Sequence, residues 1–279
     1  MNSRTWLITG VSSGLGQALA QAALERGDRV VGTVRAAAAR QEFERLAPGR
    51  AHAVLLDVTE RAAARRVVAD VEALTGGIDI LVNNAGYGFV GGVEEASETE
   101  IRAQFEVNVF GALAVIQAVL PFMRQRRAGR IVCVTSVSGL VGWPSLGIYS
   151  GSKFALEGIC ETLGQEVAPL GIRVMLVEPG GLRTDFAGRS AAHAARTIVD
   201  YDESVGACKR ILAEHAGHEP GDPQKAATAI LTALDATQPP RRLLLGEDAL
   251  KYTETKLTEF TDEIQRWKSL SLSIGFKEP

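Results

Sequence analysis

Seven short apolar runs alternate with longer helical patterns along this chain, and the alternation constrains the fold more than any other feature. The runs are continuously apolar, which is typical of parallel strands buried on both faces. Strand–helix alternation of this kind predicts an α/β fold, a doubly wound parallel sheet with helices on both faces. The predicted strands lie at 5–9, 29–34, 51–56, 78–83, 130–136, 172–178 and 241–246, and the helices at about 14–27, 60–75, 99–126, 149–168 and 223–236.

The length of 279 residues suits one large domain, so we expect a single domain over 1–279. Residues 183–222 break the alternation; they form a lid over a substrate, a helical insertion or a long surface connection, and we favour the lid. Residues 247–279 carry apolar side chains near helical spacing, which predicts a C-terminal helical extension. Its apolar side packs on its own domain, which we favour, or contacts another subunit.

Composition excludes several classes of function. The formal net charge of −3 argues against a nucleic-acid-binding protein. The three cysteines, Cys133, Cys160 and Cys208, are far apart in the sequence and fit neither a metal site nor a disulfide framework. His215 and His218 have no third ligand nearby, so we expect no metal. The start of the chain shows no targeting segment, and the apolar stretch "GALAVIQAVLPFM" is too short to span a bilayer, so we expect a cytoplasmic protein without membrane contact.

A glycine-rich turn follows the first strand. Gly10, Gly14 and Gly16 have the spacing G-x-x-x-G-x-G and open a helix. Such a turn lets the backbone approach a pyrophosphate, which then lies at the positive helix N-terminus. A tight turn without a ligand is the alternative. The position between the first strand and the first helix favours dinucleotide binding.

The second strand indicates which dinucleotide binds. An NAD site usually has an acidic residue near the end of this strand, to hold the ribose hydroxyl. Here no acid occurs between Val30 and Gln41, and Arg35 occupies the position. An arginine can pair with a 2′-phosphate, and Ser13 in the glycine turn adds a hydroxyl donor. We therefore expect NADP(H), with NAD(H) less favoured; a solvated Arg35 after an edge strand is the alternative.

A possible proton-transfer pair lies in "YSGSK". Tyr149 and Lys153 are four residues apart, which places them on one face of a helix. Most pairs of this kind are solvated helix edges. A cation one turn away can also favour the phenolate and lower the pKa of the tyrosine.

Together these motifs resemble the short-chain dehydrogenase/reductase family, over about residues 4–246. The motifs "TGVSSGLG", "LDV", "NNAG", "NVFG", "VTSVSG", "YSGSK" and "EPGGLRTDF" follow in the family's order. The resemblance implies a Rossmann-type sheet with strand order 3-2-1-4-5-6-7. It also implies cofactor contacts by Gly10, Ser12, Ser13, Gly14, Leu15, Gly16, Arg35, Asp57, Val58, Asn84, Ala85, Gly86, Tyr149, Lys153, Pro179, Gly180 and Thr184.

The resemblance implies four catalytic residues, Asn108, Ser136, Tyr149 and Lys153. Tyr149 would act as general acid in reduction and general base in oxidation. Lys153 would lower its pKa and bind the nicotinamide ribose, and Ser136 would donate to the substrate oxygen. Ser136 is preferred over Ser138 because it lies thirteen residues before Tyr149. Asn108 would position a water that links Lys153 to solvent.

The segments that border the substrate in this family are apolar here. They contain Leu140, Val141, Trp143, Pro144, Leu146, Tyr87, Phe89, Val90 and Phe186. We expect a mainly apolar ketone or secondary alcohol, as in the hydroxysteroid-dehydrogenase-like subgroup that the motifs resemble. Two alternatives remain: a cofactor-binding redox regulator without turnover, and a sugar-nucleotide epimerase or dehydratase. Helices 99–126 and 149–168 resemble those through which the family pairs subunits, which implies a homodimer or homotetramer.

Overall fold

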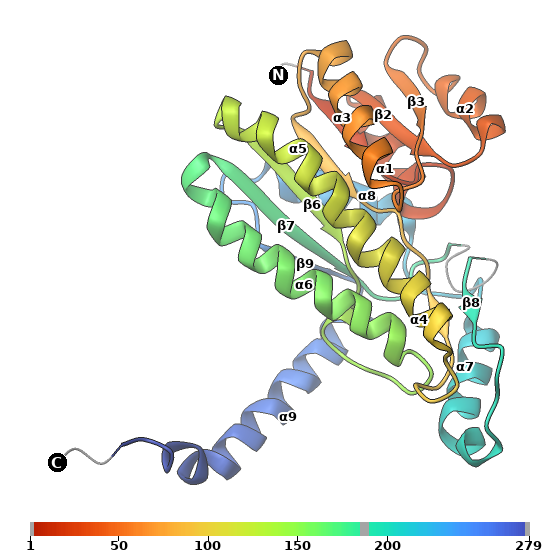
Figure 1. The fold of residues 1–279 in the computed structure, drawn as a ribbon, viewed down its shortest axis with the longest axis vertical. Helices are drawn as coiled ribbons and strands as arrows, with labels where there is room; N and C mark the ends of the chain where they lie inside the picture. The colour runs from red at the N-terminus through yellow and green to blue at the C-terminus, as the bar shows by residue number, and fades with distance from the viewer. Residues whose placement is uncertain (1–2, 185–189, 277–279) are drawn as a thin grey trace.

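A parallel sheet of seven strands forms the centre of the computed structural model, which describes residues 3–184 and 190–276 (Figure 1). Its strand order is β3-β2-β1-β4-β6-β7-β9. Two further strands, β5 (Phe89–Val90) and β8 (Ala192–His193), pair separately, so the predicted order 3-2-1-4-5-6-7 is confirmed. The seven strands are β1 (Thr5–Ile8), β2 (Arg29–Val34), β3 (Ala51–Leu55), β4 (Ile80–Asn83), β6 (Gly129–Val134), β7 (Ile172–Pro179) and β9 (Arg242–Leu245).

Helices cover both faces of the sheet and bury two cores. Successive residues of a strand point to opposite faces. In β1, Trp6 and Ile8 therefore pack in one core and Leu7 in the other, and all three are fully buried. The first core lies under α1 (Gly14–Glu25), α2 (Ala37–Glu44) and α8 (Pro223–Asp235). The second lies under α3 (Arg61–Thr75), α5 (Ala112–Arg126) and α6 (Gly147–Val167). Burial on both faces explains why the strand sequences are continuously apolar.

The predicted helix 99–126 is continuous but has an internal irregularity. α4 (Glu98–Phe105) starts at a capping box of Ser97 and Glu100, passes through the π-helical segment η1 (Glu106–Gly111) and continues as α5. By length and composition alone, residues 98–126 could cross a membrane. Val115, Val119 and Met123, however, are fully buried in the second core, so core packing accounts for the apolar composition.

Two local features are not indicated by the sequence. Helix α2 occupies 37–44, a stretch for which the sequence indicated no element. Gly27 and Gly171 have left-handed φ angles at helix ends, whereas Gly129 begins β6. Arg127 takes the left-handed conformation after α5 instead. A side chain at Gly129 would collide with Met123, so close packing is what requires this glycine.

The segment 183–222 contains short elements and is tied to the chain after β4. It includes β8, the helical turns η4 (Val199–Tyr201) and η5 (Asp202–Gly206), and α7 (Ala207–His215). β8 pairs with β5, and the buried Glu95 carboxylate accepts hydrogen bonds from the Ile198 amide at 2.9 Å and from Lys209 Nζ at 2.6 Å. The segment is therefore a docked insertion rather than an extended surface connection.

The C-terminal helix α9 (Glu247–Leu272) projects from the body of the molecule (Figure 1). Ala249 and Thr253 are buried, whereas every described residue after Thr253 is exposed. The expected packing of this helix on its own domain therefore holds only for its first two turns.

Short 3₁₀ turns complete the described part of the chain. η2 (Val137–Gly139) follows β6, and η3 (Ala168–Leu170) follows α6. η2 lies at the carboxyl edge of the sheet, where the ends of β1, β4, β6 and β7 also lie. In open α/β sheets, ligands bind in the crevice outside this edge.

Candidate active site

The glycine turn after β1 is shaped by three glycines with different roles. Gly10 and Gly14 have φ angles of +72° and +60°, which side chains rarely adopt. A Cβ on Gly16 would collide with the Gly10 carbonyl oxygen and the Asn84 amide. Gly16 therefore lies beneath the turn and makes room for Asn84, whereas a direct cofactor contact was expected of it.

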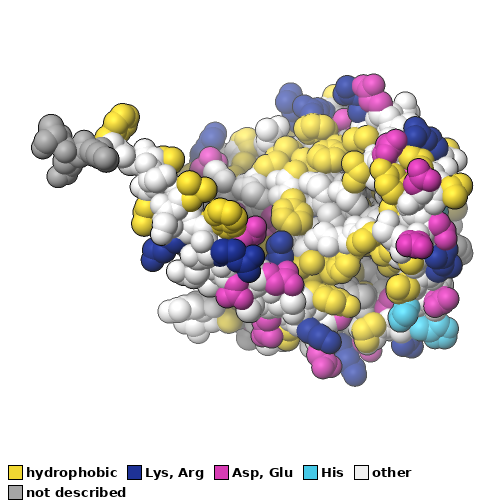
Figure 2. All heavy atoms as spheres, turned by 90° about the horizontal axis from the view of Figure 1, so that it is seen from below, with side chains coloured by type: hydrophobic (Ala, Val, Ile, Leu, Met, Phe, Trp, Pro, Cys, Tyr) yellow, Lys and Arg dark blue, Asp and Glu magenta, His cyan; other side chains and the backbone are white. Residues whose placement is uncertain are grey.

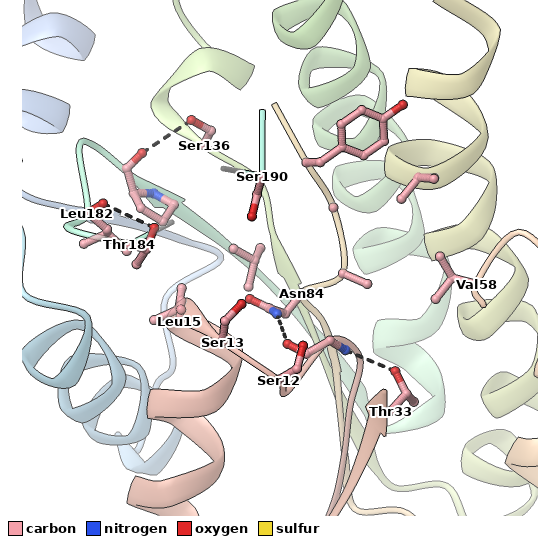
Figure 3. A pocket seen from close by; sticks show the side chains of 18 of the residues that line it. Ser12, Ser13, Leu15, Thr33, Val58, Asn84, Ser136, Leu182, Thr184 and Ser190 are labelled. Carbon is pink, nitrogen blue, oxygen red and sulfur yellow. Dashed lines mark hydrogen bonds between the residues drawn. The ribbon is translucent and has the colours of Figure 1, made fainter. Parts of the chain in front are cut away.

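Asn84 connects this turn to the end of β4. Its Nδ2 donates to the carbonyl oxygen of Thr9 at 3.0 Å. It also donates to the carbonyl oxygen of Gly10 at 2.9 Å (Figure 3). Two threonines that were not predicted from the sequence complete this network. The Thr9 hydroxyl accepts from the backbone amides of Asn84 and Ala85, both at 3.0 Å, and the Thr33 hydroxyl accepts from the Gly10 amide at 3.1 Å. Thr9 could have been identified from the sequence, because it is a hydroxyl residue directly before Gly10, where buried backbone groups need hydrogen-bond partners.

The N-terminus of α1 opens into a cavity of about 580 Å³. Ser13 is the N-cap residue, yet its hydroxyl makes no capping hydrogen bond within the described residues. The first turn, "GLGQ", contains no acid, so the positive end of the helix dipole is not neutralised locally. This end of the cavity is therefore suited to an anionic group.

Most of the expected site residues line this one cavity. They are Gly10, Ser12, Ser13, Gly14, Leu15, Arg35, Asp57, Val58, Asn84, Ala85, Gly86, Ser136, Tyr149, Lys153, Pro179, Gly180 and Thr184. Among the expected catalytic and cofactor-binding residues, only Gly16 and Asn108 do not line the cavity. The cavity is also lined by residues that the sequence analysis did not single out, among them Thr33, Val34, Leu56, Val107, Thr135 and Leu182.

Arg35 and Asp57 lie at the end of the cavity formed by β2 and β3. Both are exposed. Hydrogen bonds from the Thr59 amide and hydroxyl, at 3.0 and 2.7 Å, hold the pKa of Asp57 below its usual value, and the charge of Arg35 contributes in the same direction. Helix α3 begins at Arg61, so Thr59 bonds to Asp57 and does not cap this helix.

Ser136 and Tyr149 meet at the other end of the cavity. Ser136 precedes η2, and its hydroxyl accepts from the Ser138 amide at 3.0 Å. Burial raises the pKa of Tyr149 to about 12, and a hydrogen bond with Ser136 partly offsets this rise. Desolvation of the phenolate outweighs this contact, so the pKa of Tyr149 is raised overall, and the lowering by Lys153 stays a prediction.

Lys153 lies one turn further along α6 and is also buried. Its Nζ donates to the Val134 carbonyl oxygen at 2.9 Å and lies 5.8 Å from the centre of the Tyr149 ring. Burial lowers the pKa of Lys153 to about 8, and the nearby Glu157 carboxyl acts in the opposite direction.

Asn108 stands behind the cavity, within η1. Its Oδ1 accepts from the Tyr87 amide at 3.1 Å, and its Nδ2 donates to the Tyr87 carbonyl at 3.0 Å and to Ser152 Oγ at 3.2 Å. π-Helical turns inside α-helices are frequently found at functional sites. Here the π-helical turn places the buried Asn108 side chain against Tyr87, which follows β4, and against Ser152 near the start of α6.

A buried acidic pair lies beneath Lys153, and the sequence analysis did not predict it. Glu157 on α6 and Glu178 on β7 both pair with Arg242, which bonds Glu178 at 2.6 Å and also contacts Glu157 and Glu161. Burial raises the pKa of both carboxyls, that of Glu178 to about 7. Cys133 and Cys160 also meet here as free thiols, with their Sγ atoms 3.1 Å apart, although they are far apart in sequence.

The apolar residues expected around the substrate are only partly at the cavity. Tyr87 lines it, whereas Phe89 and Val90 are buried in β5. Trp143 packs edge-on against Tyr252 of α9, with the ring centres 5.4 Å apart. Asp248 of α9 accepts from the Gly181 amide at 2.7 Å, beside the cavity-lining Gly180. Phe186 lies outside the described residues.

Comparison with known proteins agrees with this geometry. The family model "short chain dehydrogenase" matches residues 4–195. An oxidoreductase of Botryotinia fuckeliana is 37% identical over 97% of this chain and 99% of its own length. The 3-ketodihydrosphingosine reductase of Bacteroides thetaiotaomicron is 36% identical, over 88% of this chain and 89% of its own. Human retinol dehydrogenase 8 is 36% identical, over 86% of this chain and 80% of its own length.

Two solved structures extend the comparison to the whole fold. The crystal structure of a short-chain dehydrogenase from Streptomyces avermitilis is 41% identical and superposes with a TM-score of 0.93, over 98% of this chain and 99% of that one. A short-chain dehydrogenase/reductase from Burkholderia phymatum, in complex with NAD, is 25% identical with a TM-score of 0.80, over 100% of this chain and 98% of its own.

Proposed function

The chain belongs to the short-chain dehydrogenase family of oxidoreductases, and from this premise we propose that it transfers a hydride between NADP(H) and a mainly apolar carbonyl or secondary alcohol. The observation that carries the proposal is one shared cavity. Its glycine-turn end is suited to an anionic group, and its other end holds Ser136, Tyr149 and Lys153. These are the two components that such a reaction requires of the protein.

The residues present fit a nicotinamide dinucleotide. The backbone at Gly10 to Leu15 and the N-terminus of α1 would hold the pyrophosphate. Asp57 and Val58 would hold the adenine side, and Pro179, Gly180 and Thr184 the nicotinamide side. The bound cofactor supplies or accepts the hydride. The Burkholderia phymatum relative binds NAD, which supports a nicotinamide cofactor here.

Arg35 supports NADP(H) over NAD(H). It lines the end of the cavity where β2 ends, beside Asp57, whose carboxylate accepts from the Thr59 hydroxyl. A guanidinium there can make a forked contact with a 2′-phosphate. An acid that would hold the ribose hydroxyl of NAD does not occur between Val30 and Gln41.

The protein's own groups would then manage the proton. The Ser136 hydroxyl would hold the substrate oxygen, and Tyr149 would give it a proton in reduction and remove one in oxidation. Lys153 would place a positive charge beside the phenol. Asn108 would fix the backbone of Tyr87 and the start of α6, and position a water for proton exchange with Lys153.

Two relatives support an apolar substrate. One is named for a ketone on a sphingoid chain and another for retinol, and each of these molecules joins one reacting oxygen to a long apolar body. Tyr87 and Leu182 supply apolar surface to the cavity.

We also propose that the protein is cytoplasmic and forms a homodimer or homotetramer that pairs through α4–α5 and α6.

The test is a panel of ketones and alcohols, from retinoid and sphingoid compounds to short polar ones, assayed by NADPH absorbance with NADH in parallel. We expect turnover with NADPH and a higher kcat/KM for the long apolar members. Cofactor binding measured by calorimetry, with no turnover across the whole panel, would favour the redox regulator instead. Turnover of polar substrates alone would contradict the apolar assignment.

A further inference from the structure

The part of α9 beyond Thr253 carries an apolar stripe that its own body leaves uncovered. Leu257, Phe260, Ile264 and Trp267 repeat at intervals of three and four residues, which puts them on one side of the helix. Their exposed fractions are 59%, 55%, 47% and 56%. Figure 2 shows the helix standing out from the body with hydrophobic side chains along it. A contiguous exposed apolar surface of this kind marks an interaction site.

The stripe continues the face that packs at the base of the helix. At 100° per residue, Ala249 and Thr253 point to the same side as Phe260, Ile264 and Trp267. Along the first two turns of α9, the protein's own body covers this face. Residues 254–272 extend roughly 28 Å further, at 1.5 Å per residue. The apolar face is therefore continuous, and only its outer part requires a partner.

The charges of α9 identify the partner. Residues 247–263 contain six acidic and two basic side chains, whereas residues 264–276 contain Arg266 and Lys268 and no acid. Two copies of this helix side by side in opposite directions would bring the acidic half of each against the basic half of the other. A parallel pair would oppose like charges, and the second helix would also meet the first protein's body at Ala249 and Thr253.

We infer that α9 is a dimerisation helix, whose stripe of Leu257, Phe260, Ile264 and Trp267 packs antiparallel against the same stripe of a second copy of this chain. This surface is separate from α4–α5 and α6. A membrane surface fits less well, because interfacial helices carry mainly Lys and Arg on the polar face. The charged residues of α9 are six acids and four bases, so its net charge is negative.

The extended helix is shared with a solved relative. The Streptomyces avermitilis structure matches 98% of this chain with a TM-score of 0.93. The 26 residues of α9 exceed the unmatched 2%, so the match includes most of this helix. The projection of α9 is therefore a feature that both chains have.

Dimerisation through α9 would also affect the substrate end of the cavity. Tyr252 packs against Trp143, and Asp248 holds the Gly181 amide, so the base of α9 contacts both loops that border the substrate end. A helix held at its outer half by a second copy keeps its base in place.

The experiment compares the full-length protein with Ile264→Glu in the stripe and Ser269→Glu on the opposite face, by sedimentation equilibrium. Both substitutions add one negative charge to the same half of the helix. We expect Ile264→Glu to halve the mass of the assembly and Ser269→Glu to leave it unchanged. Equal masses for all three proteins would overturn the inference. Circular dichroism and cofactor binding verify that each variant is folded.

Orientation and the membrane alternative need two further measurements. Replacing Arg266 and Lys268 together by glutamate should raise the dissociation constant at least tenfold at low salt, with a smaller effect at high salt. An unchanged constant would overturn the antiparallel arrangement. Flotation with phosphatidylcholine–phosphatidylserine vesicles should leave the wild type unbound. Flotation that Ile264→Glu abolishes, without any change in mass, would assign the stripe to lipid.

Discussion

The ammonium nitrogen of Lys153 lies 5.8 Å from the centre of the Tyr149 ring, and both side chains are about 95% buried, with exposed fractions of 5%. Burial moves the two pKa values apart, that of Tyr149 from 10.0 up to about 12 and that of Lys153 from 10.5 down to about 8. Each shift has the same cause, because burial disfavours the charged form of either group. The pair therefore favours a neutral phenol that can donate a proton.

Tyr149→Phe tests the acid–base assignment. Phenylalanine keeps the ring and removes only the hydroxyl, so the fold and the cofactor end of the cavity should be unchanged. We expect kcat to fall by at least about 10²–10⁴-fold, the usual contribution of a positioned acid or base, with a cofactor dissociation constant within about twofold of the wild type. Steady-state kinetics on a proven substrate and calorimetry measure the two quantities. A variant that keeps wild-type kcat would exclude Tyr149 from proton transfer.

The direction of the Tyr149 shift predicts opposite pH profiles for the two reaction directions. A phenol with a pKa of about 12 remains protonated throughout the neutral range, so carbonyl reduction has its proton donor at every accessible pH. Alcohol oxidation requires the phenolate, whose fraction increases as pH rises. We expect kcat/KM for oxidation to rise between pH 6 and about 9. Oxidation that is fastest at acidic pH would contradict a tyrosine base.

Cofactor preference is tested by Arg35→Asp, with Arg40→Asp as its matched control. Both arginines are exposed and close in sequence, but Arg35 lines the cavity, whereas Arg40 pairs with Glu44 on α2 at 3.3 Å. We expect Arg35→Asp to weaken NADPH binding at least tenfold and NADH binding much less. Arg40→Asp should change both by less than about twofold, since exposed ion pairs contribute little. Equal effects of the two substitutions would show that Arg35 is only a surface residue.

The strands and most of the cavity wall could be predicted because local patterns identify them, and the resemblance that the motifs carry implied the order of the strands in the sheet. Apolar runs identify buried strands, and Gly10, Gly14 and Tyr149 occur in short motifs whose order along the chain is enough to align them. The buried side chains at the site depend instead on contacts between distant segments. Glu157, Glu178 and Arg242 lie on three different elements, and none of them is unusual in its own sequence context.

The direction of the Tyr149 pKa shift and the position of α9 were also beyond the sequence. Spacing predicts that Lys153 lies near the phenol, but the extent of burial decides which influence on the pKa is larger. Helical spacing likewise predicts an amphipathic α9. Whether its apolar side meets its own body depends on the direction that the chain takes after Gly246, where φ is +112°.

Attachment of the insertion 190–222 should depend on Glu95 rather than on its neighbour Glu94. Glu95 is fully buried and accepts hydrogen bonds from the Gly92 and Ile198 amides and from Lys209, which hold its pKa at about 2. Glu94 is exposed and contacts Arg196 and Tyr201. We expect Glu95→Gln to lower stability by about 1–3 kcal/mol and to speed amide hydrogen exchange in 195–215. Glu94→Gln should cost less than about 1 kcal/mol.

The low pKa of Glu95 also predicts that the insertion 190–222 detaches more readily at acidic pH. A carboxyl whose pKa is lower in the folded protein stabilises it above the unfolded value, here 4.5, and this stabilisation is lost as pH falls toward about 2. Exchange in 195–215 should therefore accelerate between pH 4.5 and 2 in the wild type. Since intrinsic exchange also varies with pH, rates are compared as protection factors. Glu95→Gln should show no such dependence, and matching profiles for the two proteins would contradict the assignment.

The buried Glu178 predicts the opposite dependence near neutral pH. Burial and the adjacent Glu157 raise the pKa of Glu178 to about 7, so the folded protein retains a proton that the unfolded chain loses above 4.5. Stability should therefore fall as pH rises from 4.5 to about 7, by at most about 1.4 kcal/mol per pH unit. Glu178→Gln should reduce this slope in urea unfolding measured at several pH values, and the raised pKa of Glu157 should leave a smaller remainder. Glu161→Gln, which alters the exposed partner of the same Arg242, should retain the full slope, and an undiminished slope in Glu178→Gln would assign the proton to another group.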